Sequence, residues 1–180
     1  MSKLAPILLA EDDPNDVLFF SCAMKQAGLP NPLVVARDGR QAVEFLELLA
    51  NYRDRLLHPL PALMLLDLKM PRLSGFEVLA WLQTRPHLRS VPVVVLSSSP
   101  QAPDMLISRE FGAADYRVKP SRLENYVDLL NEMRTRWLVS KTPLSAPPSP
   151  SIPSSKSASP RMGIVWNESA PDRSAQSQLA

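Results

Sequence analysis

The chain has little cysteine and no long apolar run, and both absences exclude classes of protein. Cys22 is the only cysteine among the 180 residues, so no disulfide can form within the chain and no metal site can be built from a cysteine cluster. No uninterrupted apolar run approaches the roughly 20 residues that span a bilayer. The first residues also lack the apolar segment and small-residue cleavage site of a secretory signal. We therefore expect a cytoplasmic protein that is not embedded in a membrane.

An excess of charge of one sign is also lacking. The formal net charge is +2, and residues 141–180, with four bases against two acids, account for all of it. Residues 1–140 are therefore neutral. A nucleic-acid-binding protein usually concentrates lysine and arginine on one element, with aromatic or base-reading residues among them, and no such stripe is found. We do not expect this protein to bind nucleic acid.

The composition predicts one folded domain followed by a tail. With 45% hydrophobic and 21% charged residues, the chain has the composition of a globular protein, and a typical domain has about 100 to 150 residues. From residue 141 onward, prolines are interleaved with serine and alanine. Such a segment cannot bury enough apolar surface to offset the entropy lost on ordering. We therefore predict a domain over residues 1–140 and a disordered tail over residues 141–180.

Alternating strand and helix signals predict an α/β fold for the domain. Short apolar runs that favour buried strands cover residues 7–10, 33–36, 62–66, 91–96 and 115–118. Each run is followed by a segment with apolar residues at helical spacing, and these segments begin near residues 14, 39, 74, 103 and 121. The alternation favours a parallel sheet with helices on both faces. Residues 51–61 are interpreted either as an elongated loop or as an extension of the preceding helix.

Polar residues gather at the predicted ends of the strands. Six of them follow strands directly: Glu11, Asp12, Asp13, Asp67, Ser97 and Lys119. In an open parallel sheet the ligand site lies outside the carboxyl ends of the strands, so these side chains are expected at one edge. Any one of them alone could be a helix cap or a solvated loop residue. Together they indicate a site.

The acids among these residues favour a divalent cation. Three neighbouring carboxylates repel one another, and at least one of them tends to bind a proton unless a cation is present. Carboxylate ligands that leave other positions to water and phosphate oxygens suit Mg²⁺ better than a metal that prefers nitrogen or sulfur. His58 and His87 are expected on the surface, away from this edge. The sequence therefore predicts a Mg²⁺ site with oxygen ligands.

In type and order, the residues at the strand ends resemble the receiver domain of two-component response regulators. The resemblance implies a doubly wound, five-stranded parallel sheet of the flavodoxin-like (βα)5 type with strand order 2-1-3-4-5. In that family an acidic pair matches Glu11 and Asp12, and the phospho-acceptor aspartate matches Asp67. An invariant lysine before a proline matches Lys119 and Pro120, and the peptide between them is usually cis in the family.

The resemblance also implies roles for these residues. Asp67 is expected to be the nucleophile toward a phosphohistidine on a kinase. Asp12, Asp67 and the main-chain carbonyl of Lys69 are expected to hold Mg²⁺, with Glu11 acting through water. Lys119 would pair with a phosphoryl oxygen. No enzymatic activity is expected beyond Mg²⁺-dependent phosphorylation and dephosphorylation of the chain itself.

Ser97 and Tyr116 match the hydroxyl and switch positions of the family. Threonine is commoner than serine at the first of these, but the hydroxyl that donates to the phosphoryl group is kept. Drawing Ser97 toward that group would vacate space into which Tyr116 turns. This movement is expected to change the surface formed by the fourth helix, the fifth strand and the fifth helix.

A narrower resemblance rests on residues 11–16 (EDDPND), 31–33 (NPL) and 65–71 (LLDLKMP). These segments are most similar to stand-alone regulators that serve phytochrome-type and related sensor histidine kinases. The partners implied are such a kinase, a downstream phosphotransfer or effector protein, and a second copy of the chain. The homodimer would use the last helix, whose outer face is predicted to include Tyr126 and Trp137.

Three other interpretations were weighed from the residues. A phosphatase of the haloacid-dehalogenase type normally has a second aspartate two residues after the nucleophile, where this chain has Lys69. A flavin carrier needs phosphate-binding hydroxyls after the first strand, where this chain has three acids that would repel phosphate. The alternative that stays open is a receiver-like binding module that works without phosphorylation. The sequence also does not separate a phosphate shuttle from a regulator that docks on an effector.

Overall fold

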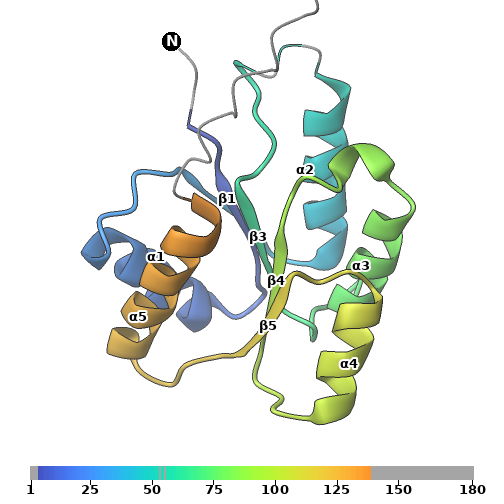
Figure 1. The fold of residues 1–180 in the computed structure, drawn as a ribbon. Helices are drawn as coiled ribbons and strands as arrows, with labels where there is room; N and C mark the ends of the chain where they lie inside the picture. Colours follow the sequence, from blue (N-terminus) through green and yellow to red (C-terminus); the bar gives the residue numbers. More distant parts are fainter. Residues whose placement is uncertain (1–3, 53, 55, 139–180) are drawn as a thin grey trace, which may run out of the picture. The chain divides into compact units, whose positions relative to one another are not determined.

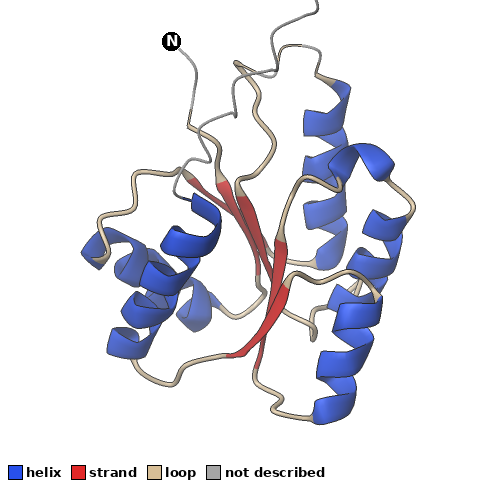
Figure 2. Cartoon of the chain, in the orientation of Figure 1, coloured by secondary structure: helices blue, strands red, loops and turns tan. Residues whose placement is uncertain are grey.

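A computed structural model describes residues 4–52, 54 and 56–138, and these residues form a sheet between two layers of helices (Figures 1 and 2). The strands are β1 (Ile7–Ala10), β2 (Leu33–Ala36), β3 (Leu63–Leu66), β4 (Val93–Ser97) and β5 (Asp115–Val118). The helices are α1 (Pro14–Gln26), α2 (Gly39–Asn51), α3 (Gly75–Gln83), α4 (Ala102–Glu110) and α5 (Leu123–Met133). The disorder predicted for residues 141–180 lies outside the described residues.

The strands form one parallel sheet in the order β2-β1-β3-β4-β5. This confirms the predicted doubly wound, flavodoxin-like topology. The strand order reverses beside β1, and β1 pairs with β2 on one side and with β3 on the other. The register places Ala10 beside both Ala36 and Leu66. Glu11 and Asp67, the residues that follow Ala10 and Leu66, are thereby brought together at the carboxyl edge of the sheet.

Apolar side chains cover both faces of the sheet. Alternate strand residues such as Leu8 and Met64 pack against α2 and α3, whereas Ile7 and Leu65 pack against α1 and α5. Figure 1 shows α1 and α5 on one side of the sheet and α2, α3 and α4 on the other. Each fully buried leucine or isoleucine contributes about 1.5 to 3 kcal/mol. Burial on both faces explains why the strands read as unbroken apolar runs.

Strand and helix limits differ slightly from those predicted. The fourth strand was predicted from residue 91, but β4 begins at Val93. Pro92 has no N–H to donate to the ladder, and prolines are confined to the start or edge of strands. The interpretation of residues 51–61 as an extension of the helix is not supported at its start, since α2 ends at Asn51 and Tyr52 has an extended backbone. Two short elements were not predicted: a 3₁₀ turn at Pro86–Leu88 and a π-helical turn at Arg134–Leu138 after α5.

The prediction that Tyr126 lies on the outer face of the last helix is wrong. Tyr126 is only 2% exposed and lies in the apolar cluster between α1 and α5. Its ring stacks on that of Phe19 in α1, with 6.3 Å between the ring centroids. A tyrosine ring buries its apolar body while its hydroxyl reaches a polar partner. A homodimer that uses the last helix would therefore have to form without Tyr126.

Two further features of the backbone bear on the predictions. The expected cis peptide between Lys119 and Pro120 is not found, because the described residues contain no cis peptide bond. None of the described helices is both long enough and apolar enough to cross a membrane.

Candidate functional site

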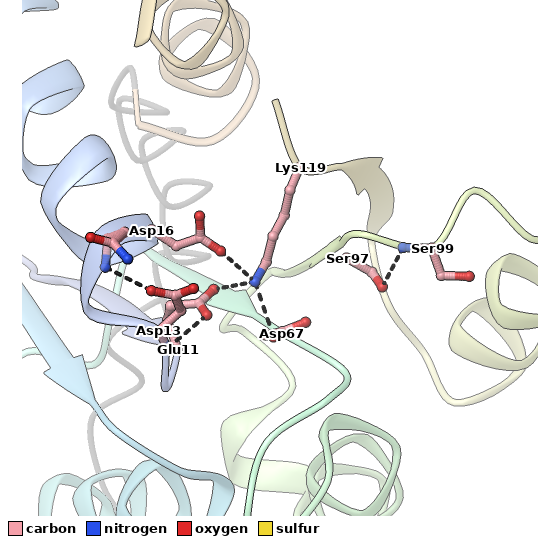
Figure 3. Close-up of polar contacts among 8 residues, drawn as sticks. Glu11, Asp13, Asp16, Asp67, Ser97, Ser99 and Lys119 are labelled. Atoms are coloured by element: carbon pink, nitrogen blue, oxygen red, sulfur yellow. Dashed lines mark hydrogen bonds and ion pairs between the residues drawn. The ribbon is translucent and has the colours of Figure 1, made fainter. Parts of the chain in front are cut away.

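Glu11, Asp67 and Lys119 meet at the carboxyl edge of the sheet (Figure 3). One carboxylate oxygen from each of Glu11, Asp12 and Asp67 lies within 4.8 Å of the other two. Glu11 and Asp67 are only 2% and 6% exposed, whereas Asp12 faces solvent. The site is therefore a partly open acidic pocket with a buried floor.

Lys119 reaches this pocket from the end of β5 and contacts three carboxylates. Its Nζ lies 2.7 Å from Glu11 Oε2, 2.9 Å from Asp16 Oδ2 and 3.0 Å from Asp67 Oδ2. Burial by itself would lower the pKa of Lys119, but hydrogen bonds to Glu11 and Asp16 and the charge of Asp67 raise that pKa above its ordinary value. Lys119 therefore stays protonated at neutral pH, and its single positive charge is shared among three acids.

Glu11 is the acid most perturbed by its surroundings. Burial raises the pKa of Glu11 to about 7, and the charge of Asp67 adds to this effect, although Lys119 opposes it. The carboxylate still has a protein partner on each oxygen: Oε2 pairs with Lys119, and Oε1 accepts a hydrogen bond of 3.2 Å from the backbone N–H of Asp13. The pocket thus holds more negative charge than Lys119 neutralises.

Ser97 and Tyr116 are linked through the loop that follows β4. Ser97 is fully buried, and its Oγ accepts a hydrogen bond of 3.2 Å from the backbone N–H of Ser99. The Tyr116 hydroxyl donates a hydrogen bond of 2.6 Å to the carbonyl of Ser99. Tyr116 is 8% exposed, so its ring is already turned inward in this structure. One residue, Ser99, therefore connects the Ser97 hydroxyl with the aromatic ring on β5.

A family model described as the response regulator receiver domain matches residues 7–131. This chain belongs to the response regulator receiver family. The pocket described above is accordingly the acidic pocket of a receiver, which confirms the family assigned from the residues at the strand ends.

Similar proteins include several response regulators, among them phytochrome and bacteriophytochrome response regulators. Response regulator Rcp1 of Synechocystis is 33% identical over 136 residues, which cover 76% of this chain and 90% of Rcp1. The crystal structure of the Mn²⁺-bound form of Rcp1 has a TM-score of 0.64 at 32% identity, and the match covers 77% of this chain and 97% of that one.

Two further solved structures support the same grouping. The phosphorylated cyanobacterial phytochrome response regulator RcpA is 30% identical with a TM-score of 0.65, and the match covers 75% of this chain and 94% of RcpA. The bacteriophytochrome response regulator RtBRR is 39% identical with a TM-score of 0.62, covering 81% of this chain and 85% of RtBRR. The narrower resemblance to regulators of phytochrome type is thereby confirmed.

The receiver pocket fits a divalent metal ion. Its donors are all carboxylate oxygens, which hard cations such as Mg²⁺ and Mn²⁺ accept. Burial, with a smaller effect from the charge of Asp67, raises the pKa of Glu11, and a bound cation would favour the ionised form. Asp13 does not join this set, because its side chain caps α1 by accepting a hydrogen bond of 2.8 Å from the backbone N–H of Asn15.

Asp16 belongs to the receiver pocket but was not predicted from the sequence. It lies in the first turn of α1 and shares the Lys119 amine with the two buried acids. Burial raises the pKa of Tyr126 in α5, and the charge of Asp16 adds to the rise. The signal that could have revealed Asp16 is its spacing, since it falls three residues after the capping Asp13 and one helical turn from the pocket.

The loop from β3 to α3 carries Asp67 and Lys69 and is held tightly. Leu68 and Met70 are buried on either side of the exposed Lys69. At the far end of the loop the backbone N–H of Gly75 donates a hydrogen bond of 3.0 Å to the carbonyl of Leu68. A Cβ on Gly75 would lie 2.3 Å from the carbonyl oxygen of Asp67, so only glycine fits there.

Proposed function

We propose that the chain is a response regulator that accepts a phosphoryl group on Asp67 from a sensor histidine kinase, with Mg²⁺ as cofactor. The observation that carries the proposal is the surroundings of Asp67: a nearly buried carboxylate, paired with Lys119 at 3.0 Å and grouped with Glu11 and Asp12. A carboxylate nucleophile of this kind forms a covalent intermediate, and the protein contributes mainly positioning and charge.

In the proposed reaction a carboxylate oxygen of Asp67 attacks the phosphorus of a phosphohistidine. An O–P bond forms, the N–P bond breaks, and the leaving imidazole nitrogen keeps the electron pair and takes a proton. Bound Mg²⁺ would supply positive charge next to the phosphoryl oxygens. Asp12, Asp67 and the main-chain carbonyl of Lys69 would hold it. Glu11 would act through water, and the protein partners on both of its carboxylate oxygens support this role.

Lys119 and Ser97 are proposed to bind the transferred group. Lys119 already contacts the acceptor carboxylate, so its amine can pair with a phosphoryl oxygen after a small movement. The hydroxyl of Ser97 would donate a hydrogen bond to another phosphoryl oxygen. To do so it must turn away from the backbone N–H of Ser99, to which it is bonded at 3.2 Å.

We propose that the turn of the Ser97 hydroxyl away from Ser99 is the conformational switch. Ser99 would lose its hydrogen bond to Ser97 while its carbonyl still accepts from the Tyr116 hydroxyl. The loop before α4 and the ring on β5 would then move together, because both depend on Ser99. Phosphorylation would thereby shift a pre-existing equilibrium and alter the surface formed by α4, β5 and α5.

The proposed setting is a cytoplasmic two-component pathway. The similarity to RcpA, a phytochrome response regulator, and to RtBRR, a bacteriophytochrome response regulator, supports a kinase of phytochrome type as the phosphodonor. A downstream phosphotransfer or effector protein would receive the signal, and a second copy of the chain is a further proposed partner. Hydrolysis of the acyl phosphate by the chain itself would end the signal.

The proposal is tested by intact-mass measurement after incubation with Mg²⁺ and acetyl phosphate. Wild type is expected to gain one phosphoryl group, and neither Asp67→Asn nor wild type with a chelator should gain it. If the wild type gains nothing and also fails to bind beryllofluoride, the chain is a receiver-like module that works without phosphorylation. Equal labelling of Asp67→Asn would show that the acceptor is a different residue.

A further inference from the structure

The acceptor loop after β3 rests on the turn between β2 and α2. Gly39 opens α2, and a Cβ at this position would lie 2.2 Å from the carbonyl oxygen of Leu73. The two backbones therefore touch, and glycine is needed at the contact. A change in one turn must displace the other, because packed protein interiors transmit strain.

Arg72 stands at the point where the acceptor loop reverses. It is the only described residue other than glycine with a positive φ, which is 65°. The backbone N–H of Leu73 donates to the carbonyl of Pro71 at 2.7 Å, so three residues close a γ-turn around Arg72. A non-glycine residue keeps such a strained conformation only when its surroundings hold it there.

The arginine side chain supplies a partner for a buried acid. Its Nη2 lies 3.0 Å from Oδ2 of Asp38, whose side chain is completely buried. The other oxygen of Asp38 caps α2 by accepting a hydrogen bond of 2.9 Å from the backbone N–H of Gln41. Oδ2 accepts no well-formed hydrogen bond from the described residues. The ion pair with Arg72 is therefore the compensation that this buried charge receives.

We propose that Arg72 is a positioning residue for the metal-binding loop. Through its ion pair with Asp38, it holds the backbone of residues 67–73 so that the carbonyl of Lys69, three residues earlier, faces the acidic pocket before any cation binds. This inference rests on the proposed function, which assigns that carbonyl to Mg²⁺. Arg72 itself stays 66% exposed and touches neither the acceptor nor the phosphoryl group.

The strained turn and the ion pair predict different behaviour for two substitutions. Arg72→Gly relieves the positive φ but removes the ion pair, whereas Arg72→Lys keeps a charge near Asp38 without the planar fork of the guanidinium. If the ion pair positions the loop, Arg72→Gly impairs Mg²⁺ binding, and Arg72→Lys impairs it less than Arg72→Gly does. Asp38→Asn removes the same ion pair from its other side while an amide oxygen still caps α2.

The first readout is Mg²⁺ binding measured by titration calorimetry on the full chain, because it needs no phosphoryl transfer. The Mg²⁺ dissociation constant is expected to rise about 10-fold in Arg72→Ala, Arg72→Gly and Asp38→Asn. This is the lower end of the range for groups that orient metal ligands, since Leu68 and Met70 also anchor the loop. The double variant Arg72→Ala/Asp38→Asn should be no worse than either single variant.

The second readout is the rate of labelling by acetyl phosphate as a function of Mg²⁺ concentration. The half-saturating concentration should rise by the same factor, while the rate at saturating Mg²⁺ stays within about twofold, because Asp67 and Lys119 are untouched. Unchanged Mg²⁺ affinity in Arg72→Ala and Asp38→Asn would overturn the inference. Wild-type Mg²⁺ affinity in Arg72→Gly would also overturn the inference, because it would mean that only the strained backbone mattered. A wild type that binds Mg²⁺ but takes up no phosphoryl group would defeat the proposed function alone.

Discussion

Replacement of Asp16 by asparagine tests how the pocket holds Lys119 before phosphorylation. Asp16 Oδ2 lies 2.9 Å from Lys119 Nζ, and the carboxylate is 27% exposed. At this distance the Coulomb attraction is about 6 kcal/mol at an effective dielectric constant of 20. Desolvation and solvent screening offset most of it, and about 1 kcal/mol is a realistic net value for such a pair.

In the proposed mechanism Lys119 leaves Asp16 to reach a phosphoryl oxygen. The loss of this attraction opposes phosphorylation. Asp16→Asn is therefore expected to tighten the binding of beryllofluoride in the presence of Mg²⁺ by about fivefold, which corresponds to about 1 kcal/mol. The assay is a calorimetric or fluorescence titration of the full chain. Asp16→Asn should also lengthen the lifetime of the phosphorylated form.

Asp13→Asn is the matched control for this prediction. It removes one negative charge three residues away, but Asp13 caps α1 and does not contact Lys119 among the described contacts. Asparagine caps helices as well as aspartate does. An equal gain in beryllofluoride affinity in both variants would show that the effect comes only from the lower negative charge near the pocket. Weaker binding in Asp16→Asn would show that Asp16 helps to aim Lys119 at the phosphoryl group, and would refute the reasoning.

Three other outcomes are expected. In metal-free protein the raised pKa of Glu11, about 7, means that the folded state binds this proton more tightly than the unfolded state does. The free energy of unfolding should therefore fall by up to about 3 kcal/mol between pH 4.5 and 7, and urea denaturation of Glu11→Gln should not show that fall. Tyr116→Phe leaves the Ser99 carbonyl without its 2.6 Å donor, and should lower the free energy of unfolding by about 1 to 3 kcal/mol in the same assay. Replacement of Lys69, exposed two residues after Asp67, should change the half-life of the phosphorylated form by more than about twofold, because we expect an attacking water to approach past this side chain. An unchanged half-life would contradict the last of these.

The sequence predicted the strands and the main site because both depend on local patterns. Strands buried on both faces must be continuous apolar runs, and residues that follow parallel strands must gather at one edge. This rule alone was enough to predict that Glu11 and Asp67 lie close together. β4 and α5 each begin about two residues later than predicted, because ladder pairing and capping decide where an element begins.

The remaining features depend on contacts between distant segments. Lys119 and Asp16 are 103 residues apart, and their contact follows from the packing of α1 on α5. The pair between Arg72 and Asp38 exists only because two turns of the sheet edge meet. Tyr126 was misplaced because tyrosine suits both a surface and an interior, and its burial depends on the packing of α5 against α1, where its ring stacks on Phe19.

The most direct test of the central claim is to locate the phosphoryl group. Wild type labelled with acetyl phosphate and Mg²⁺ would be treated with borohydride, which reduces an acyl phosphate of aspartate to homoserine, and then digested and sequenced by mass spectrometry. We predict homoserine at residue 67, dependent on Mg²⁺ and at no other acid of the pocket. Homoserine at residue 12, the longer amino alcohol that a reduced glutamate gives at residue 11, or a reduced aspartate at residue 67 in protein labelled without Mg²⁺, would contradict the account.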